Sequence, residues 1–490
     1  MSGQNNLGVN DQQLLRNSSY INGSWQSAGT YFSVTNPANG TQLIQVINAD
    51  IETAELAVEA AKNALALWSA TPANERAKLM RNWFDLMMAH QDDLGRILTF
   101  EQGKPLAEAK GEIAYGAAFI EWFAEEGKRV YGDTIPAPAN DKRIIVLKQP
   151  VGVVASITPW NFPNAMIARK AAAALAAGCT FVVRPATQTP LSALAMAELA
   201  ERAGIPAGVF NVVVGDDAKG IGKVLTQHPD IAKFTFTGST ATGKKLISQC
   251  ATTVKKVSME LGGNAPFIVF DDADIDAAVQ GAITSKYRNA GQTCVCTNRI
   301  LVQQSILDTF TKKFTEAAAK LTVGDGQLAG VDIGPMISKA AVNDVQQLVQ
   351  KSIAAGANLA LGGAQHQAGE CFYQPTVLTQ VTNDMPVAAN EIFGPVSPII
   401  AFKQEADAIA MANDTEYGLA AYFYARDIGR IWRVAEQLNY GMVGINEGII
   451  SNAAAPFGGV KQSGNGREGS KYGLDDYLEI KYLCLGGLDR

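Results

Sequence analysis

Two side chains in this sequence have the type and surroundings of a nucleophile and its base. Cys294 lies in the segment GQTCVC, where the preceding G-Q-T makes a polar approach that suits an accessible thiol. A thiol nucleophile needs a base or an electrophile-binding site within reach. The three histidines of the chain, His90, His228 and His366, lie far from this segment in the sequence. A carboxylate is therefore the next candidate for the base.

Glu260, in MELGG, is that candidate. It stands between Met259 and Leu261 and is followed by two glycines that let a backbone or a water molecule come close. A carboxyl flanked by apolar groups tends to have a raised pKa, as a general base near neutral pH requires. Other interpretations stay open here: a surface Glu at a strand end, and for Cys294 a buried core thiol or, with Cys296, half of a metal site.

Three glycine-rich or acidic motifs give weaker evidence for a function than Cys294 and Glu260 do. GSTATGKK follows an apolar strand and opens a helix, so Gly238 and Gly243 leave backbone N–H groups to face a pyrophosphate; a plain strand-to-helix turn is the alternative. Lys245 replaces the hydroxyl residue of a Walker loop, which disfavours ATP hydrolysis. GNGREG (464–469) has no strand before it and is interpreted as a turn, and DDADID (271–276) as acids that open a helix. No metal site is predicted.

The composition excludes several classes of protein. The 490 residues, 47% hydrophobic and 18% charged, are typical of a globular protein with a large core. A net charge of −6 makes nucleic acid and anionic membranes unexpected partners. Six scattered cysteines exclude a disulfide scaffold. The N-terminus lacks the apolar run of a signal peptide, and the longest uncharged stretch, 149–168, contains three prolines. We therefore expect no membrane span and a cytoplasmic location.

A regular alternation of strands and helices begins at Val151. Expected strands such as VGVVASIT and KFTFT alternate with helical patterns such as Met166–Ala177 and Pro190–Ala203. This order is typical of a parallel sheet covered by helices on both faces. A second α/β run starts at APFIVF (265–270) and ends near VGIN, with no linker between the two runs. We expect two domains packed side by side with a ligand cleft between them.

The flanking segments have different patterns. Before the alternation, apolar spacing predicts helices over Ala54–Trp68 and Asn74–Gly103 and an edge strand at RIIVL (143–147). The last segment, DDYLEIKYLCLGGL (475–488), alternates like a strand. Because an apolar terminal strand needs a partner, we expect oligomerisation.

Six motifs, in this order along the chain, resemble those of the aldehyde dehydrogenase superfamily: PWNFP (159–163), FTGST (236–240), MELGG (259–263), GQTC (291–294), EIFGP (391–395) and PFGG (456–459). The resemblance covers nearly the whole chain, from INGSW (21–25) to the C-terminal strand. Within that family, KYRNAGQTCVC and GREGSKYGLDDYLEIKYLC resemble segments of the succinate-semialdehyde dehydrogenases.

The resemblance implies an α/β fold with a doubly wound parallel-sheet cofactor domain, a second α/β catalytic domain and a small β oligomerisation arm. We expect the cofactor domain over 1–128 and 148–260, the catalytic domain over 261–460, and the arm over 129–147 and 474–490. The implied partners are a small semialdehyde substrate and further copies of the chain in a homodimer or homotetramer.

The resemblance also assigns chemical roles. Cys294 attacks the aldehyde carbon, and the resulting oxyanion is held by the Asn161 side-chain amide and the Cys294 N–H, each donor contributing about 3 kcal/mol. Hydride transfer to a nicotinamide leaves a thioester, and Glu260 activates the water that hydrolyses it. The cofactor is NADP or NAD, and the residues expected to contact it are Trp160, Gly238, Ser239, Gly243, Glu391 and Phe393.

One departure from the family pattern concerns cofactor choice. The family usually has Lys in K-P-A at the adenosine ribose, where this chain has Arg184, and NAD-preferring members often carry Glu three residues on, where this chain has Thr187. An Arg fork suits a phosphate, and Thr does not repel one. We therefore expect NADP to be accepted and preferred over NAD.

For the substrate, the resemblance places Arg169, Arg288 and Ser451 at the positions that bind an ω-carboxylate, and Phe162 and Phe457 along the methylene chain. Solvent-facing arginines are the alternative that the sequence alone leaves open.

Cys296 is a candidate redox switch, since a disulfide with Cys294 would close a very small, strained ring and block the nucleophile. A spectator thiol is the alternative. Three other functions also stay open: glutarate-semialdehyde or broader aldehyde oxidation, a cofactor-free cysteine hydrolase or acyltransferase, and a non-catalytic structural protein.

Overall fold

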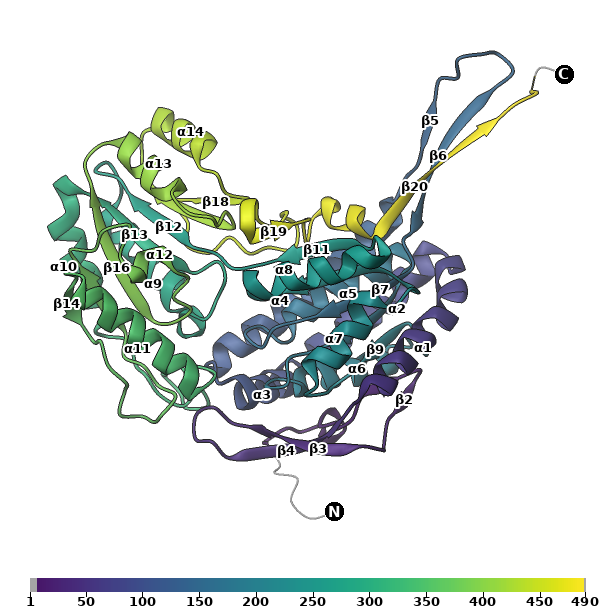
Figure 1. The fold of residues 1–490 in the computed structure, drawn as a ribbon, viewed down its shortest axis with the longest axis horizontal. Helices are drawn as coiled ribbons and strands as arrows, with labels where there is room; N and C mark the ends of the chain where they lie inside the picture. The colour runs from purple at the N-terminus through teal and green to yellow at the C-terminus, as the bar shows by residue number, and fades with distance from the viewer. Residues whose placement is uncertain (1–6, 489–490) are drawn as a thin grey trace.

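The computed structural model describes residues 7–488, in which two large sheets each carry helices (Figure 1). The ranges predicted for the domains also include residues 1–6 and 489–490, which lie outside the described part. The division of the chain into those ranges remains a prediction.

The first sheet has eight strands in the order β19-β11-β10-β7-β8-β9-β1-β2, of which β11, β10, β7, β8 and β9 run parallel. Their bounds are β1 (Tyr20–Ile21), β2 (Ser24–Trp25), β7 (Val153–Ile157), β8 (Thr180–Arg184), β9 (Phe210–Val212), β10 (Ile231–Thr237), β11 (Lys256–Glu260) and β19 (Gly464–Asn465).

Helices cover both faces of this sheet. They are α1 (Ile51–Ala70), α2 (Ala73–Ala89), α3 (Gln91–Gln102), α4 (Leu106–Glu126), α5 (Ala165–Ala177), α6 (Leu191–Arg202), α7 (Ala218–Gln227) and α8 (Thr240–Cys250). Successive strand side chains point to opposite faces. Val154 and Phe181 accordingly share a core with α5 and α6, whereas Val153 and Val182 share one with α1 and α7. The doubly wound arrangement is confirmed.

The second sheet has seven strands in the order β14-β15-β16-β13-β12-β17-β18, parallel except for the β14–β15 pair. Its strands are β12 (Ala265–Val269), β13 (Thr297–Gln303), β14 (Asn358–Leu361), β15 (Thr376–Thr379), β16 (Val396–Phe402), β17 (Ala420–Tyr424) and β18 (Met442–Ile445). The helices of this part are α9 (Ile275–Tyr287), α10 (Leu307–Ala318), α11 (Lys339–Ala354), α12 (Pro386–Ala389), α13 (Glu405–Asn413) and α14 (Ile428–Gln437).

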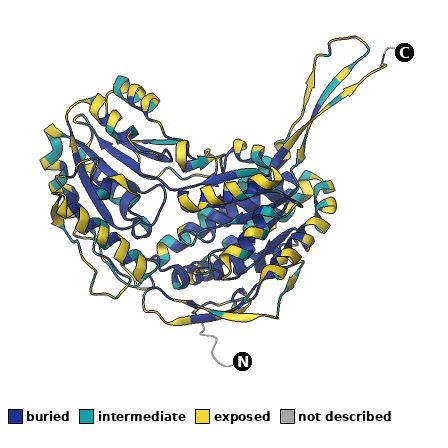
Figure 2. Ribbon diagram, viewed as in Figure 1, coloured by how far each residue is buried: buried dark blue, intermediate teal, exposed yellow. Residues whose placement is uncertain are grey.

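A three-stranded antiparallel arm projects from the body (Figure 1). It consists of β5 (Asp133–Ile135), β6 (Arg143–Pro150) and β20 (Leu478–Leu485), and its side chains are mostly exposed or half-buried, in contrast to the two sheets (Figure 2). The terminal strand β20 thus finds a partner within its own chain, along the whole length of β6. A separate hairpin, β3 (Thr30–Thr35) and β4 (Gln42–Asn48), precedes α1.

Two sequence expectations need correction. The pattern over Asn74–Gly103 predicted one helix, but the chain leaves helical geometry at His90 and forms α2 and α3 instead. GNGREG was interpreted as a turn, yet its first two residues pair with β11 as the edge strand β19. As expected for DDADID, Asp274 caps α9 by accepting a hydrogen bond from the Ala277 N–H at 3.1 Å. Within residues 7–488 no helix is long and apolar enough to span a membrane.

Candidate active site

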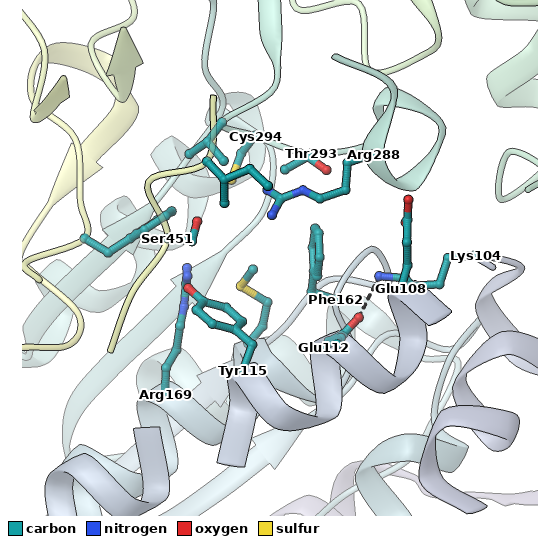
Figure 3. A pocket seen from close by; sticks show the side chains of 15 residues that line it. Lys104, Glu108, Glu112, Tyr115, Phe162, Arg169, Arg288, Thr293, Cys294 and Ser451 are labelled. Carbon is teal, nitrogen blue, oxygen red and sulfur yellow. Dashed lines mark hydrogen bonds and ion pairs between the residues drawn. The ribbon is translucent and has the colours of Figure 1, made fainter. Parts of the chain in front are cut away.

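Cys294 lies where two cavities meet. The first has a volume of about 300 Å³, and the residues predicted for the substrate all line it: Phe162, Arg169, Arg288, Ser451 and Phe457 (Figure 3). The second has a volume of about 250 Å³ and is lined by Trp160, Asn161, Gly238, Ser239, Glu260, Glu391 and Phe393. The thiol is therefore the group shared by the predicted substrate and nicotinamide regions.

The loop that carries Cys294 joins α9 to β13, and buried amides fix its backbone. Asn289 and Ala290 both adopt left-handed φ, at 52° and 55°. The Gln292 carbonyl accepts hydrogen bonds from Nδ2 of Asn161 at 2.9 Å and from Nδ2 of Asn289 at 3.2 Å. The Gln292 side chain donates back to the Asn289 carbonyl at 3.2 Å. Paired buried polar groups of this kind hold a nucleophile in one geometry.

Asn161 follows β7 and reaches the same loop from the other sheet. Its side-chain amide has two N–H donors, and the bond to the Gln292 carbonyl uses one of them. Asn161 is 4% exposed and lines the second cavity together with Cys294. This position fits the predicted role of an amide donor to an oxyanion at Cys294.

Glu260 stands at the end of β11 and is 3% exposed. Burial, and then the negative charge of Glu468, raises the pKa of Glu260 well above its ordinary value. Burial alone would also raise the pKa of Glu468, but its ion pairs with Arg169 and Lys170 lower it. The two carboxyls therefore differ: Glu468 is the ionised partner of two cations, and Glu260 is the carboxyl that takes up a proton.

Cys294 itself is a protonated thiol at neutral pH. Burial raises the pKa of the Cys294 thiol to about 12, with Arg169 opposing this shift and Glu391 and Glu260 adding to it. Because the thiolate is the nucleophile, the thiol needs a proton acceptor before it can attack. Glu260 lines the same cavity and is the candidate acceptor.

The first cavity has the chemistry of an anion-binding pocket. The Arg169 guanidinium and the hydroxyls of Tyr115 and Ser451 point toward one region of it, and Arg288 reaches in from the loop beside Cys294 (Figure 3). Nη2 of Arg169 and Nε of Arg288 are buried without a hydrogen-bond partner in the described structure. Unpaired buried donors of a cation favour an anionic ligand. The carbon wall between them comes partly from Phe162 and Phe457.

The second cavity fits a nicotinamide. Trp160 and Phe393 form an aromatic wall, with ring centroids 5.6 Å apart and planes at 88°. The Thr237 hydroxyl and Oε2 of Glu260 are buried there without hydrogen-bond partners among the described residues. Glu391 is held by the Gly263 N–H at 3.0 Å, and burial raises its pKa to about 7. Ser239 caps α8 at the edge of the cavity, where a helix N-terminus suits a phosphate.

Four of the predicted residues do not line either cavity. Gly243 packs α8 against β11, because a Cβ there would come 2.4 Å from Leu261 Cδ2. Nη2 of Arg184 donates to the Gly215 carbonyl at 2.8 Å, and Thr187 is half-buried in a separate hollow. Cys296 is buried, and its Sγ donates to the Lys286 carbonyl at 3.4 Å. Their predicted roles with cofactor and thiol stay predictions.

The structure adds residues that the sequence motifs did not single out. Lys104, Glu108, Glu112 and Tyr115, all at or after the end of α3, line the substrate cavity. Glu108, Glu112 and Tyr115 form the sequence pattern E-x-x-x-E-x-x-Y, which the sequence analysis did not single out, and Lys104 lies outside it. Glu468 lies inside GNGREG (464–469), which was interpreted as a turn without a role for its carboxylate. Among residues 7–488 no cluster of side chains has the ligands for a metal ion.

The two-sheet α/β fold and the paired cavities that meet at Cys294 are typical of an enzyme that binds a nucleotide cofactor in a cleft. A sequence model described as the aldehyde dehydrogenase family matches residues 25–483. The chain belongs to the aldehyde dehydrogenase family.

Curated relatives are similar over nearly their full length. A succinate-semialdehyde dehydrogenase named for NADP(+) from Escherichia coli (strain K12) is 60% identical over 98% of this chain and 99% of its own. A glutarate-semialdehyde dehydrogenase from Pseudomonas aeruginosa is 59% identical over 98% and 100%. A 3-sulfolactaldehyde dehydrogenase from Pseudomonas putida is 60% identical over 99% and 100%.

Solved structures agree with the fold. A crystal structure described as an E. coli NADP-dependent enzyme has a TM-score of 0.97 and 60% identity, covering 98% of this chain and 100% of that one. A betaine aldehyde dehydrogenase from Staphylococcus aureus, in complex with NAD+, has a TM-score of 0.94 and 36% identity, covering 98% and 97%.

The raised pKa of Cys294 predicts the pH dependence of its alkylation. Since the thiolate is the reactive form, the rate with iodoacetamide should rise by about tenfold per pH unit through neutral pH, with no plateau below pH about 10. Peptide mass spectrometry measures the rate at Cys294, with exposed Cys484 as the internal reference for the reagent. A plateau near neutral pH would contradict the assigned protonation state.

Proposed function

We propose that this protein oxidises an aldehyde with a second, anionic end, succinate semialdehyde first among them, to the acid with NADP or NAD. The observation that carries the proposal is the placement of Cys294 between a cavity with two arginines and a cavity that fits a nicotinamide. The bound cofactor supplies the hydride acceptor. Residues of this chain bind the substrate, form the thioester and hydrolyse it.

Each step has a residue in position. Arg169, Arg288 and Ser451 hold the anionic end, so that the aldehyde carbon lies at Cys294. The thiol gives its proton to Glu260, which releases it to solvent before the later hydrolysis step. The sulfur adds to that carbon, and the oxyanion is bound by Asn161 and the Cys294 N–H. After oxidation the acyl group is a thioester on the sulfur. Glu260 then takes a proton from water, whose oxygen attacks the thioester carbon and releases the acid.

The length of the substrate is the finer part of the proposal. Glutarate semialdehyde, one methylene longer, is the second candidate, because relatives named for it and for succinate semialdehyde are almost equally identical to this chain. A hydrophobic pocket separates such a pair by only about 1–3 kcal/mol. Sulfolactaldehyde, named in a third relative, likewise combines an aldehyde with an anion.

We propose further copies of the same chain as protein partners, in a homodimer or homotetramer. The arm offers Ile480 and Tyr482 with 72% and 60% of their surface exposed, and the outer edge of β20. Such apolar edges are normally covered.

Cys296 is proposed as the redox partner of Cys294: peroxide would oxidise the two thiols to a disulfide with release of two waters, and a dithiol would reverse it.

Glu260→Gln tests the proposed function and the base together. Wild type should form reduced cofactor from succinate semialdehyde, and the variant should turn over about 10²- to 10⁴-fold more slowly without a burst, because Cys294 has lost its proton acceptor as well as the base for hydrolysis. A burst of about one reduced cofactor per site in the variant would show that Glu260 acts on the water alone. Stopped-flow ultraviolet absorbance measures any burst and the steady-state rate. The matched control is exposed Glu316→Gln, expected to behave as wild type. Absence of any reduced cofactor in wild type would favour the cofactor-free hydrolase instead.

Arg288→Ala tests the anion site. Loss of one charged hydrogen-bond donor should raise KM for succinate semialdehyde by about ten- to a hundredfold, since such bonds contribute about 1.5–3 kcal/mol. KM for butanal, which has no carboxylate, should change little. A substitution of Arg169 would be harder to interpret, because it would also remove the ion pair with Glu468. Equal changes for both aldehydes would refute the assignment.

Thr187→Glu tests cofactor choice. A carboxylate beside the adenosine ribose repels a 2′-phosphate and accepts hydroxyl donors, so the ratio of kcat/KM for NADP over NAD should fall by about tenfold or more. Burial lowers the pKa of Arg184, and the charges of Asp217 and Asp216 oppose this shift. Asp216→Asn removes one of these negative charges and is expected to raise that ratio. An unchanged ratio in both variants would show that these residues do not face the cofactor.

A further inference from the structure

Lys104 is a buried cation of the substrate cavity that the proposed reaction does not use. It follows α3, its side chain is 1% exposed, and its Nζ lies 2.6 Å from Oε2 of Glu112, whose side chain is also 1% exposed. A buried ion pair is retained at a desolvation cost and is weak evidence for stability by itself. We therefore infer the role of Lys104 from the groups that its atoms contact.

The Lys104 ammonium has two hydrogen-bond acceptors and an aromatic ring as partners. One N–H donates to Glu112, a second donates to the Asn161 backbone carbonyl at 2.8 Å, and the ammonium lies 3.8 Å from the centroid of the Phe162 ring, the geometry of a cation–π contact. Two of its three N–H donors are therefore used within the described chain, and the Phe162 ring contacts the same ammonium. Lys104 thus differs from Arg169 and Arg288, which line the same cavity and each keep a buried N–H without an acceptor among the described residues.

The carbonyl that Lys104 holds belongs to the residue whose side chain is the proposed oxyanion donor. The same carbonyl accepts a bond from Asn289 Nδ2 at 3.0 Å, and Asn289 and Asn161 both donate to the Gln292 carbonyl, two residues before Cys294. These bonds form a closed ring between the Asn161 peptide and the nucleophile loop. Lys104 contacts this ring from the side of the substrate cavity.

Glu112 binds the backbone just after Phe162, whereas Lys104 binds it just before, at Asn161. Its Oε1 accepts the backbone N–H groups of Asn164 at 3.0 Å and Ala165 at 3.2 Å, at the start of α5. The ion pair therefore binds the chain on both sides of Phe162. The Lys104 backbone is itself constrained, because Gly103 has a φ of 98° and a Cβ there would come 2.5 Å from Pro335.

We propose that Lys104 is a positioning residue: its ion pair with Glu112 holds the Asn161 peptide so that the side-chain amide of Asn161 faces the oxyanion formed at Cys294. The inference rests on the proposed function and adds a residue to its machinery. A displacement of about 1 Å at a reacting centre costs about a hundredfold in rate, so a residue that only holds Asn161 can matter as much as a direct contact.

The test is the double variant Lys104→Met/Glu112→Gln. Lys104→Met alone would leave a buried unpaired carboxylate and can fail to fold for that reason. In the double variant both charges are gone, and the Gln carbonyl oxygen can still accept the two N–H groups of α5. Lys110→Met, which removes a surface lysine of α4 paired with Asp92, is the matched control.

In the double variant, kcat should fall by about ten- to a thousandfold for succinate semialdehyde and for butanal alike, the range seen when an oxyanion donor is lost or misplaced. Alkylation of Cys294 by iodoacetamide, a displacement at carbon that forms no oxyanion, should stay within about twofold of wild type. The Tm should stay close to that of wild type and of Lys110→Met.

Three results would overturn the inference. One is an unchanged kcat in a folded double variant. Another is a rise of KM for succinate semialdehyde alone, which would make Lys104 an anion ligand. The third is an alkylation rate that falls together with kcat, which would mean that the pair supports the nucleophile loop as a whole. If wild type oxidises neither aldehyde, the proposed function fails instead, and this outcome is distinct from the other three.

Discussion

Glu468 is a buried carboxylate that faces two buried cations, Arg169 and Lys170, and lies close enough to Glu260 to affect its protonation. Water does not solvate charges in such a buried site, so neighbouring groups of opposite charge must compensate each of them. With Glu468 ionised, Arg169 is compensated and still keeps an unpaired N–H in the substrate cavity. With Glu468 ionised, a second negative charge on Glu260 is also disfavoured. The same carboxylate thus affects both Arg169, the proposed ligand of the substrate anion, and Glu260, the proposed base.

The geometry of the site depends on segments that are distant in sequence. Asn161 follows a strand of the first sheet, Cys294 precedes a strand of the second, and Lys104 comes from the turn after α3. The ring of hydrogen bonds among Asn161, Asn289 and Gln292 links the chain after a strand of the first sheet to the loop before a strand of the second. Hydrogen bonds between rigid elements are what hold reacting groups at fixed separations.

Much of this arrangement was predictable from the sequence, and the reasons differ by residue. Uninterrupted apolar strands such as VVASI predicted the parallel sheet because both faces of a parallel sheet are covered. The six motifs placed Cys294, Glu260 and Asn161 through their resemblance to a family. Lys104 and Glu468 gave no comparable signal, because their significance lies in partners 57 and 298 residues away along the chain. The break between α2 and α3 was missed because the apolar spacing continues across His90.

The single sulfur that separates the two cavities also governs how the protein can be studied with small molecules. A covalent reagent that reacts at Cys294 can extend an acidic head toward Arg288 on one side and a flat heteroaromatic tail toward Trp160 on the other. Such a bifunctional warhead would gain selectivity from both compartments at once, while surface thiols such as Cys484 offer neither. The architecture thereby lends itself to chemical probes that report on occupancy of the whole reaction centre.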